Sequence, residues 1–139
     1  MKAKSVSVIF DTNVWISFLI GKRLSSLHEI LASRKINIIY CNQLILEMRL
    51  VTSKPKLKKY FQEAAVEEMI DLIKTIGFHY SVKPQHHISR DAKDDFLLDL
   101  AAISNADFLV TGDKDLLILH PFLNTSIVSP SVFEKRLKG

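Results

Sequence analysis

Acidic side chains next to apolar segments are the residues of this chain best suited to chemistry. Asp11 directly follows one short apolar run, and Asp113 stands three residues after another. Asp95 and Asp99 are one helical turn apart in a stretch that is otherwise almost entirely apolar. Carboxylates in apolar surroundings are rarely left without a partner or a metal ion. The joint pattern therefore indicates a cluster of carboxylates.

A divalent cation is the common way to neutralise carboxylates that would otherwise repel one another. Oxygen ligands favour Mg²⁺ or Mn²⁺ over zinc. The histidine pair at 86–87 lies in a polar loop and Cys41 is the only cysteine, so no spaced zinc ligands are present. We expect Asp11, Asp95 and Asp113 to hold the metal, at a site that can hydrolyse a phosphodiester.

Each acid taken alone has a simpler explanation. Asp95 or Asp113 could only cap a helix. Asp99 could pair with a lysine or an arginine. Glu47 and Asp115 could be solvated surface residues. The cation site is thus a hypothesis about the acids as a set.

Short apolar segments alternate with amphipathic ones along the whole chain. We predict strands over 6–10, 37–40, 79–82, 108–111 and 125–128. We predict helices over 13–19, from 25 or 26 to 32, 42–51, 63–76, 95–104, 113–117 and from Pro130 onward, with Asp11 or Thr12, Asn42 and Asp94 at helix starts and Gly77 at a helix end. This alternation predicts a parallel sheet covered on both faces, with ligands bound beyond the carboxyl ends of the strands.

The size and composition of the chain suit one domain covering residues 1–139. A single cysteine fits a reducing compartment, and the start of the chain lacks the pattern of a signal peptide. No apolar run is long enough to cross a membrane, so we expect a cytoplasmic protein. The net charge of +4 is a mild bias toward polyanions.

Lysines form the densest charged segment of the chain. They are Lys54, Lys56, Lys58 and Lys59, and a second basic group follows near the C-terminus with Lys135, Arg136 and Lys138. We expect the first group to bind the phosphate backbone of a nucleic acid or else an acidic partner. A merely solvated surface explains the same runs equally well.

Four segments together resemble the PIN-domain nucleases, and within them the VapC-like toxins of type II bacterial and archaeal toxin–antitoxin systems. The segments are Phe10-Asp-Thr-Asn-Val-Trp, Asn42-Gln-Leu-Ile-Leu followed by Glu47, Asp94-Asp-Phe-Leu-Leu-Asp-Leu-Ala, and Val110-Thr-Gly-Asp-Lys-Asp-Leu-Leu. Their order and separation agree with the family over nearly the whole chain. Asp-Thr-Asn alone is a weak signal, and the last segment makes the set specific.

The resemblance implies an α/β/α sandwich with a central parallel sheet and Mg²⁺- or Mn²⁺-dependent cleavage of RNA. It implies a homodimer and a cognate antitoxin protein that blocks the site. The acidic quartet of the family falls on Asp11, Glu47, Asp95 and Asp113. Supporting positions fall on Asn13, Asp99, Thr111 and Asp115. Asp94 is the alternative to its neighbour as the ligand, and spacing favours Asp95.

Two other readings compete with a nuclease. A haloacid-dehalogenase-type phosphotransferase also has an Asp after its first strand, but it needs a second Asp two residues later, where this chain has Asn13. A catalytically inactive nucleic-acid-binding or scaffold module with the same fold is the non-enzymatic alternative. The intact set of acids argues against it.

Overall fold

A five-stranded parallel sheet is the centre of the computed structural model, which describes residues 5–20, 36–83 and 95–138. The strands are β1 (Val6–Phe10), β2 (Ile36–Tyr40), β3 (Phe78–His79), β4 (Phe108–Val110) and β5 (Ser126–Val128). Their order in the sheet is β3-β2-β1-β4-β5, and every neighbouring pair is parallel. The predicted parallel sheet is confirmed.

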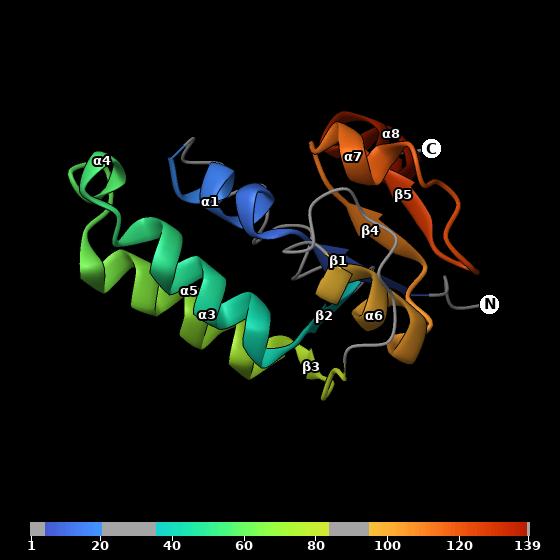
Figure 1. Ribbon diagram of the computed structural model, residues 1–139, viewed down its shortest axis with the longest axis horizontal. Helices are drawn as coiled ribbons and strands as arrows, with labels where there is room; N and C mark the ends of the chain where they lie inside the picture. The colour runs from blue at the N-terminus through green and yellow to red at the C-terminus, as the bar shows by residue number, and fades with distance from the viewer. Residues whose placement is uncertain (1–4, 21–35, 84–94, 139) are drawn as a thin grey trace.

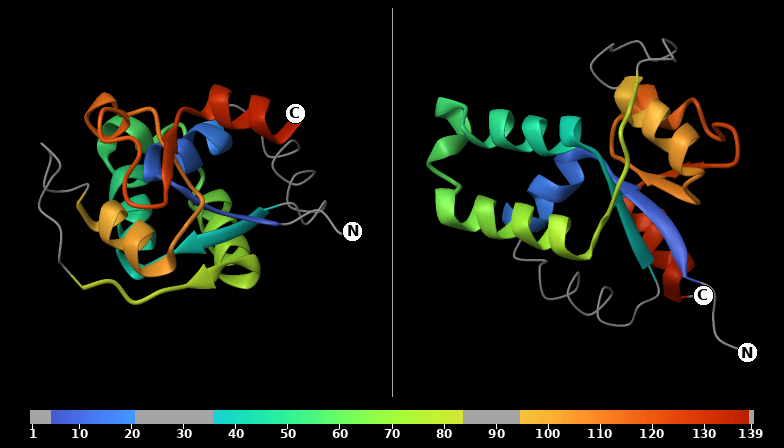
Figure 2. Two further views of the ribbon diagram at one scale, coloured as in Figure 1. Left: turned by 90° about the vertical axis from the view of Figure 1, so that its right-hand side faces the viewer. Right: turned by 90° about the horizontal axis from the view of Figure 1, so that it is seen from below.

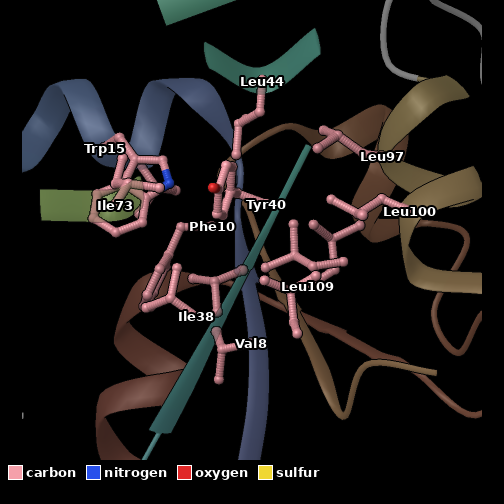
Figure 3. Packing of buried hydrophobic residues seen from close by; sticks show 14 of the residues in the cluster. Val8, Phe10, Trp15, Ile38, Tyr40, Leu44, Ile73, Leu97, Leu100 and Leu109 are labelled. Atoms are coloured by element: carbon pink, nitrogen blue, oxygen red, sulfur yellow. The ribbon is translucent and has the colours of Figure 1, made fainter. Parts of the chain in front are cut away.

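Helices cover both faces of this sheet (Figure 1). They are α1 (Thr12–Ile20), α3 (Asn42–Thr52), α4 (Pro55–Lys58), α5 (Glu63–Ile76), α6 (Asp95–Ser104), α7 (Lys114–Leu117) and α8 (Pro130–Lys138). Figure 3 shows Trp15 and Ile73 on one side of the strands, and Leu97 and Leu100 of α6 on the other. The protein is therefore a three-layer α/β/α sandwich, as predicted.

The apolar run of β1 is explained by burial on both faces of the central strand. Val8, Ile9 and Phe10 are each at most 2% exposed. The Phe10 ring makes edge-to-face contacts with Trp15 and with Phe133, at centroid distances of 5.2 Å and 5.7 Å. Such contacts add to the free energy of burial. They join α1 and α8 to the strand that ends at Asp11.

The order of the strands puts the topological switch point of the sheet between β1 and β4, and we call this place the crevice. From β1 the chain moves through β2 to β3 on one side, and it then crosses to β4 on the other side of β1. Helices that leave two neighbouring strands toward different sides open a gap at the carboxyl ends of those strands, where α/β proteins bind ligands. Asp11 and Thr111 directly follow these two strands.

The helices α3 and α5 form an arm that projects from the carboxyl end of β2. They run side by side away from the sheet, and α4 joins them at the far end (Figures 1 and 2). The buried stripe of α5 holds the pair together through Val66, Met69, Ile70 and Ile73. No helix within the described ranges is long and apolar enough to cross a bilayer.

Several sequence predictions about element boundaries need correction. The strand expected over 79–82 is the two-residue β3, Phe78–His79, and the short helix α4 was not foreseen. Cys41, not Asn42, occupies the N-cap of α3, because the Asn42 side chain instead pairs with His79 Nε2 at 3.1 Å. The helix expected to end at residue 32 and the cap expected at Asp94 lie outside the described residues.

Gly77 ends α5 for a steric reason. Its φ of −85° is open to any residue, so the left-handed conformation typical of a glycine at a helix end is absent. A Cβ at this position would lie 2.4 Å from the Ile73 carbonyl oxygen and 2.8 Å from Tyr40 Cδ1. Glycine is required because a side chain would clash both with the last turn of α5 and with Tyr40 of β2.

We therefore predict that Gly77→Ala lowers the free energy of unfolding by about 1–3 kcal/mol, the usual cost of overpacking. Gly112→Ala is the matched control, because its added Cβ meets no atom within 4 Å. Urea denaturation followed by circular dichroism measures both. Equal stability of the two variants would show that the contact of Gly77 with Tyr40 is not tight.

Candidate metal centre

Asp11 is held rigidly at the point where β1 passes into α1. Its Oδ1 accepts hydrogen bonds from the backbone N–H groups of Asn13 at 2.7 Å and Val14 at 3.2 Å, which caps the helix. Its Oδ2 accepts the hydroxyl hydrogen of Thr111 at 2.5 Å. The side chain is only 5% exposed. Three hydrogen bonds thus fix a buried carboxylate in the crevice between β1 and β4.

Thr111 joins the two halves of the crevice. Its hydroxyl donates to Asp11 and accepts the backbone N–H of Asp113 at 3.0 Å. The Oδ1 atom of Asp113 accepts the backbone N–H of Asp115 at 2.9 Å and so caps α7. One buried threonine therefore positions both acids. The exposed Asn13 and the half-buried Asp115 contribute through their backbone N–H groups.

The electrostatics of this pair favour a cation. Burial raises the pKa of the Asp11 carboxyl, and the charge of Asp113 raises it further. The hydrogen bonds from Thr111, Val14 and Asn13 lower the pKa but do not offset the burial. Ionisation of Asp11 therefore carries a free-energy cost in the metal-free protein. A nearby positive charge would remove that cost.

The two acids of α6 are buried, and the sequence predicts this for Asp99. Asp95 is 7% exposed and Asp99 is 5% exposed. Since β3 and β4 are parallel, the chain must return along the sheet between them, and α6 makes this return from the carboxyl ends of the strands. Asp95 therefore begins its helix at the end of the sheet where Asp11 lies.

Asp99 faces a separate hollow. It lines a pocket of about 460 Å³ with Ser81, Lys83, Ala102 and Ile103. Neither acid of the β1–β4 crevice is among the described lining residues of this pocket. This pocket is thus distinct from the place where Asp11 and Asp113 lie.

Glu47 is half-buried on α3, between exposed Leu46 and buried Met48. Burial raises the pKa of the Cys41 thiol, and the charge of Glu47 raises it further. Glu47 is thus close enough to the carboxyl end of β2 to act electrostatically there. Cys41 is kept as a thiol, which is a poor nucleophile.

The donor set of the crevice fits Mg²⁺ or Mn²⁺. All the candidate ligands are oxygens, and a carboxylate has about four acceptor positions, of which Asp11 uses three. Within the described ranges, no three acidic, histidine or cysteine side chains lie close enough together to enclose an ion. Mg²⁺ keeps several bound waters and binds few carboxylates directly. A site in which Asp11 and Asp113 form a pair and the other acids lie farther away therefore suits this ion.

Two buried polar atoms near this centre were not foreseen from the sequence. Thr12 Oγ1 and Trp15 Nε1 are buried and have no hydrogen-bond partner among the residues that the structure describes. They stand three positions apart on α1, so they share one face of the helix. A threonine and a tryptophan in an apolar helix look like ordinary core residues, and no sequence pattern distinguishes them.

The lysine group of residues 54–59 does not lie in the crevice. All four of its lysines are exposed and lie in and around α4, at the far end of the arm from the sheet (Figure 2). The pairing of β1 with β4 places Asp11 beside Thr111. The four lysines lie away from these two residues.

The fold and the crevice define a class: a parallel α/β/α protein with acidic residues at the topological switch point of its sheet. Residues 7–115 match the sequence profile of the PIN domain. The match covers most of the chain, and the chain belongs to the PIN domain family. No protein among the curated sequences matches it.

Solved structures agree with this fold. The protein PAE2754 from Pyrobaculum aerophilum has a TM-score of 0.65 at 16% identity, over 99% of this chain and 94% of that one. VapBC2 from Rickettsia felis, bound to a DNA fragment from its promoter, has a TM-score of 0.58 at 13% identity, over 88% and 98%. VapC20 from Mycobacterium tuberculosis, a toxin that cleaves the sarcin–ricin loop, has a TM-score of 0.54 at 11% identity, over 86% and 98%.

We predict that Asp11→Asn changes how stability depends on pH in EDTA. A raised pKa in the folded state means that Asp11 favours folding most below its unfolded pKa of about 3.9, and this contribution is lost as pH rises through the folded pKa. Asparagine does not titrate and can still accept the Asn13 and Val14 N–H groups. The stability of Asp11→Asn relative to wild type should therefore increase from pH 4 upward.

Urea denaturation of both proteins between pH 4 and pH 8 measures this difference. Asp71→Asn on the exposed face of α5 is the control for loss of one carboxylate. A difference that stays constant with pH, or that falls as pH rises, would contradict the account of Asp11 as a costly buried charge.

Proposed function

We propose that the chain is a metal-dependent endoribonuclease that hydrolyses single-stranded RNA, and that it is the cytoplasmic toxin of a toxin–antitoxin pair. The observation that carries this proposal is the hydrogen-bonded link from Asp11 through Thr111 to Asp113 at the switch point of a PIN-domain sheet. It fixes two carboxylates where a phosphodiester can enter. The whole chain, residues 1–139, would act as one nuclease domain.

The acidic residues would have different roles according to their positions. Asp11, Asp95 and Asp113 would hold Mg²⁺ or Mn²⁺ mostly through water molecules, and Glu47 would position the attacking water or a second ion. A bound cation supplies stabilisation of the phosphorane charge and lowers the pKa of a water molecule. Thr111 keeps the two crevice acids in place. The backbone of Asn13 and that of Asp115 support this arrangement, as Asp99 would from α6.

Water is the most suitable nucleophile near the crevice. Cys41 is a buried thiol, and the Ser17 hydroxyl donates to the Asn13 carbonyl at 2.9 Å. His79 is engaged with Asn42 beside β2. We therefore propose direct attack without a covalent enzyme intermediate. The water oxygen bonds to phosphorus and its proton is taken up by solvent or a carboxylate. The bond from phosphorus to the ribose 3′-oxygen breaks, and that oxygen takes a proton from solvent to become a hydroxyl.

The partners follow from the same proposal. The similar fold of VapBC2 and of the toxin VapC20 supports a cognate antitoxin protein and an RNA substrate, and we propose a homodimer as the active assembly. The four lysines of α4 and its flanks would bind the RNA backbone or an acidic partner.

We predict cleavage products that carry a 5′-phosphate and a 3′-hydroxyl. In-line attack by water with departure of the 3′-oxygen leaves these ends and does not involve the ribose 2′-hydroxyl. End-group analysis of RNA cut by purified protein measures them, with Asp11→Asn as the control for contaminating nuclease. Products ending in a 2′,3′-cyclic phosphate would refute the mechanism.

We also predict that Mn²⁺ stabilises the wild-type fold. A ligand that binds only the folded protein raises its stability by mass action, by about 2.7 kcal/mol at one hundred times the dissociation constant. Thermal unfolding with increasing Mn²⁺ should show a rising midpoint in wild type and a much smaller rise in Asp113→Asn. Asp71→Asn should behave as wild type.

This measurement also separates the enzyme from the inactive module with the same fold. Mn²⁺ stabilisation that depends on Asp113, together with RNA cleavage that depends on Asp11, supports the nuclease. RNA binding without cleavage at any Mn²⁺ or Mg²⁺ concentration would instead identify a binding or scaffold module.

A further inference from the structure

The end of the α3–α5 arm carries a dense group of exposed lysines. We call it the basic tip, defined as Lys54, Lys56, Lys58, Lys59 and Tyr60. Pro55 opens α4, and the backbone N–H groups of Leu57 and Lys58 close its first turn on the Lys54 carbonyl at 2.9 Å and 2.8 Å. Leu57 turns inward toward the core while the lysines stay exposed. The turn therefore presents its charges to solvent.

The lysines of the basic tip take part in no ion pair with another residue that the structure describes. The one ion pair between described residues is Arg49–Glu67, at 3.1 Å. Four like charges within six residues repel one another, and this repulsion is relieved when a polyanion binds.

An exposed aromatic ring accompanies the lysines. Tyr60 is 61% exposed, and the Lys59 ammonium lies 5.1 Å from its ring centroid. Proteins that bind single-stranded nucleic acid combine basic side chains for the phosphates with aromatic rings on which bases stack. An acidic protein segment would use the lysines but would gain little from the ring. The pairing of Tyr60 with the lysines thus favours a nucleic acid strand.

The basic tip also borders a hollow of suitable size. A pocket of about 360 Å³ opens between α3 and α5, and its lining includes Lys58 and Phe61 together with Arg49 and the acids Glu63 and Glu67. A strand that follows the tip could place a base against this concave surface. A helical hairpin without such a pocket at its end would offer no concave surface to a base.

The basic tip is separated from the carboxylates by the length of α3. The helix has 11 residues, which corresponds to about 16 Å at a rise of about 1.5 Å per residue. The arm starts at the carboxyl end of β2 and projects outward from it (Figures 1 and 2). A strand bound at the tip can therefore reach the crevice, but a different nucleotide must occupy each place.

We propose that the basic tip is an exosite for single-stranded RNA, in which Tyr60 stacks on a base and the lysines bind phosphates several nucleotides away from the scissile bond. This inference rests on the proposed nuclease function, because the exosite would hold the substrate of the same crevice. It assigns to Tyr60 a role in substrate binding that does not involve the reacting atoms.

Equilibrium binding in EDTA tests the exosite without any cleavage. The probe is a fluorescein-labelled single-stranded RNA of 20 nucleotides and mixed sequence. We expect Tyr60→Ala to weaken binding about tenfold, the loss of one stacked base, and Tyr60→Phe to bind within about twofold of wild type. Equal affinities of Tyr60→Ala and wild type would overturn the assignment of Tyr60.

The lysines are tested by the salt dependence of the same binding. Lys56→Gln with Lys58→Gln should reduce the slope of log affinity against log salt by about 1.4, or about 0.7 for each lost phosphate contact on a single strand. Lys74→Gln with Lys135→Gln removes the same charge from exposed sites elsewhere and should leave the slope nearly unchanged. Equal slopes in the two double variants would refute the exosite.

Competition by polyglutamate separates RNA from an acidic protein partner. If polyglutamate displaces the RNA at equal charge concentration and Tyr60→Ala has no effect, the tip is a site for acidic protein segments and the proposal is wrong. If the wild-type protein cleaves no RNA but the tip-dependent binding is present, the proposed nuclease activity fails while the exosite stands.

Discussion

The parallel pairing of β1 with β4 is the constraint on which the rest of this protein depends. Its register sets Phe10 against Val110, so the next residue of each strand, Asp11 and Thr111, can meet across the crevice. The hydrogen bond from Thr111 to the buried Asp11 carboxylate joins the ends of the two strands. Edge-to-face contacts of Phe10 with Trp15 and the burial of β1 on both faces stabilise this pairing, since a slip by one residue would turn Phe10 away from Trp15.

Much of this arrangement could be predicted because parallel strands and their ends have strong sequence signals. The apolar runs before Asp11 and Thr111 identified both strands, and α5 was predicted with its observed bounds because its apolar residues follow a regular helical spacing. The burial of Asp11 and Asp99 was likewise indicated by their apolar neighbours.

The misses have physical reasons that lie in tertiary structure. The N-cap of α3 is Cys41, and the Asn42 side chain forms a hydrogen bond with His79, a residue 37 positions away on β3. Gly77 is needed because a Cβ would clash with the Ile73 carbonyl oxygen of its own helix and with Tyr40 on another strand, and not because of a left-handed φ. The place of the lysines at the end of an arm depends on how α3 and α5 pack. Local sequence carries none of these long-range contacts. The roles of the acids in catalysis remain a prediction.

Direct observation of the ion is the most decisive test of the central claim, that the paired carboxylates of β1 and β4 form a cation site. Crystals grown with Mn²⁺ and measured at its absorption edge would locate the ion by anomalous scattering. The account predicts a peak in the crevice, with oxygens of Asp11 and Asp113 at about 2.1 Å or joined to the ion through one water. A Mn²⁺ ion bound elsewhere, with the crevice empty at saturating concentration, would contradict it.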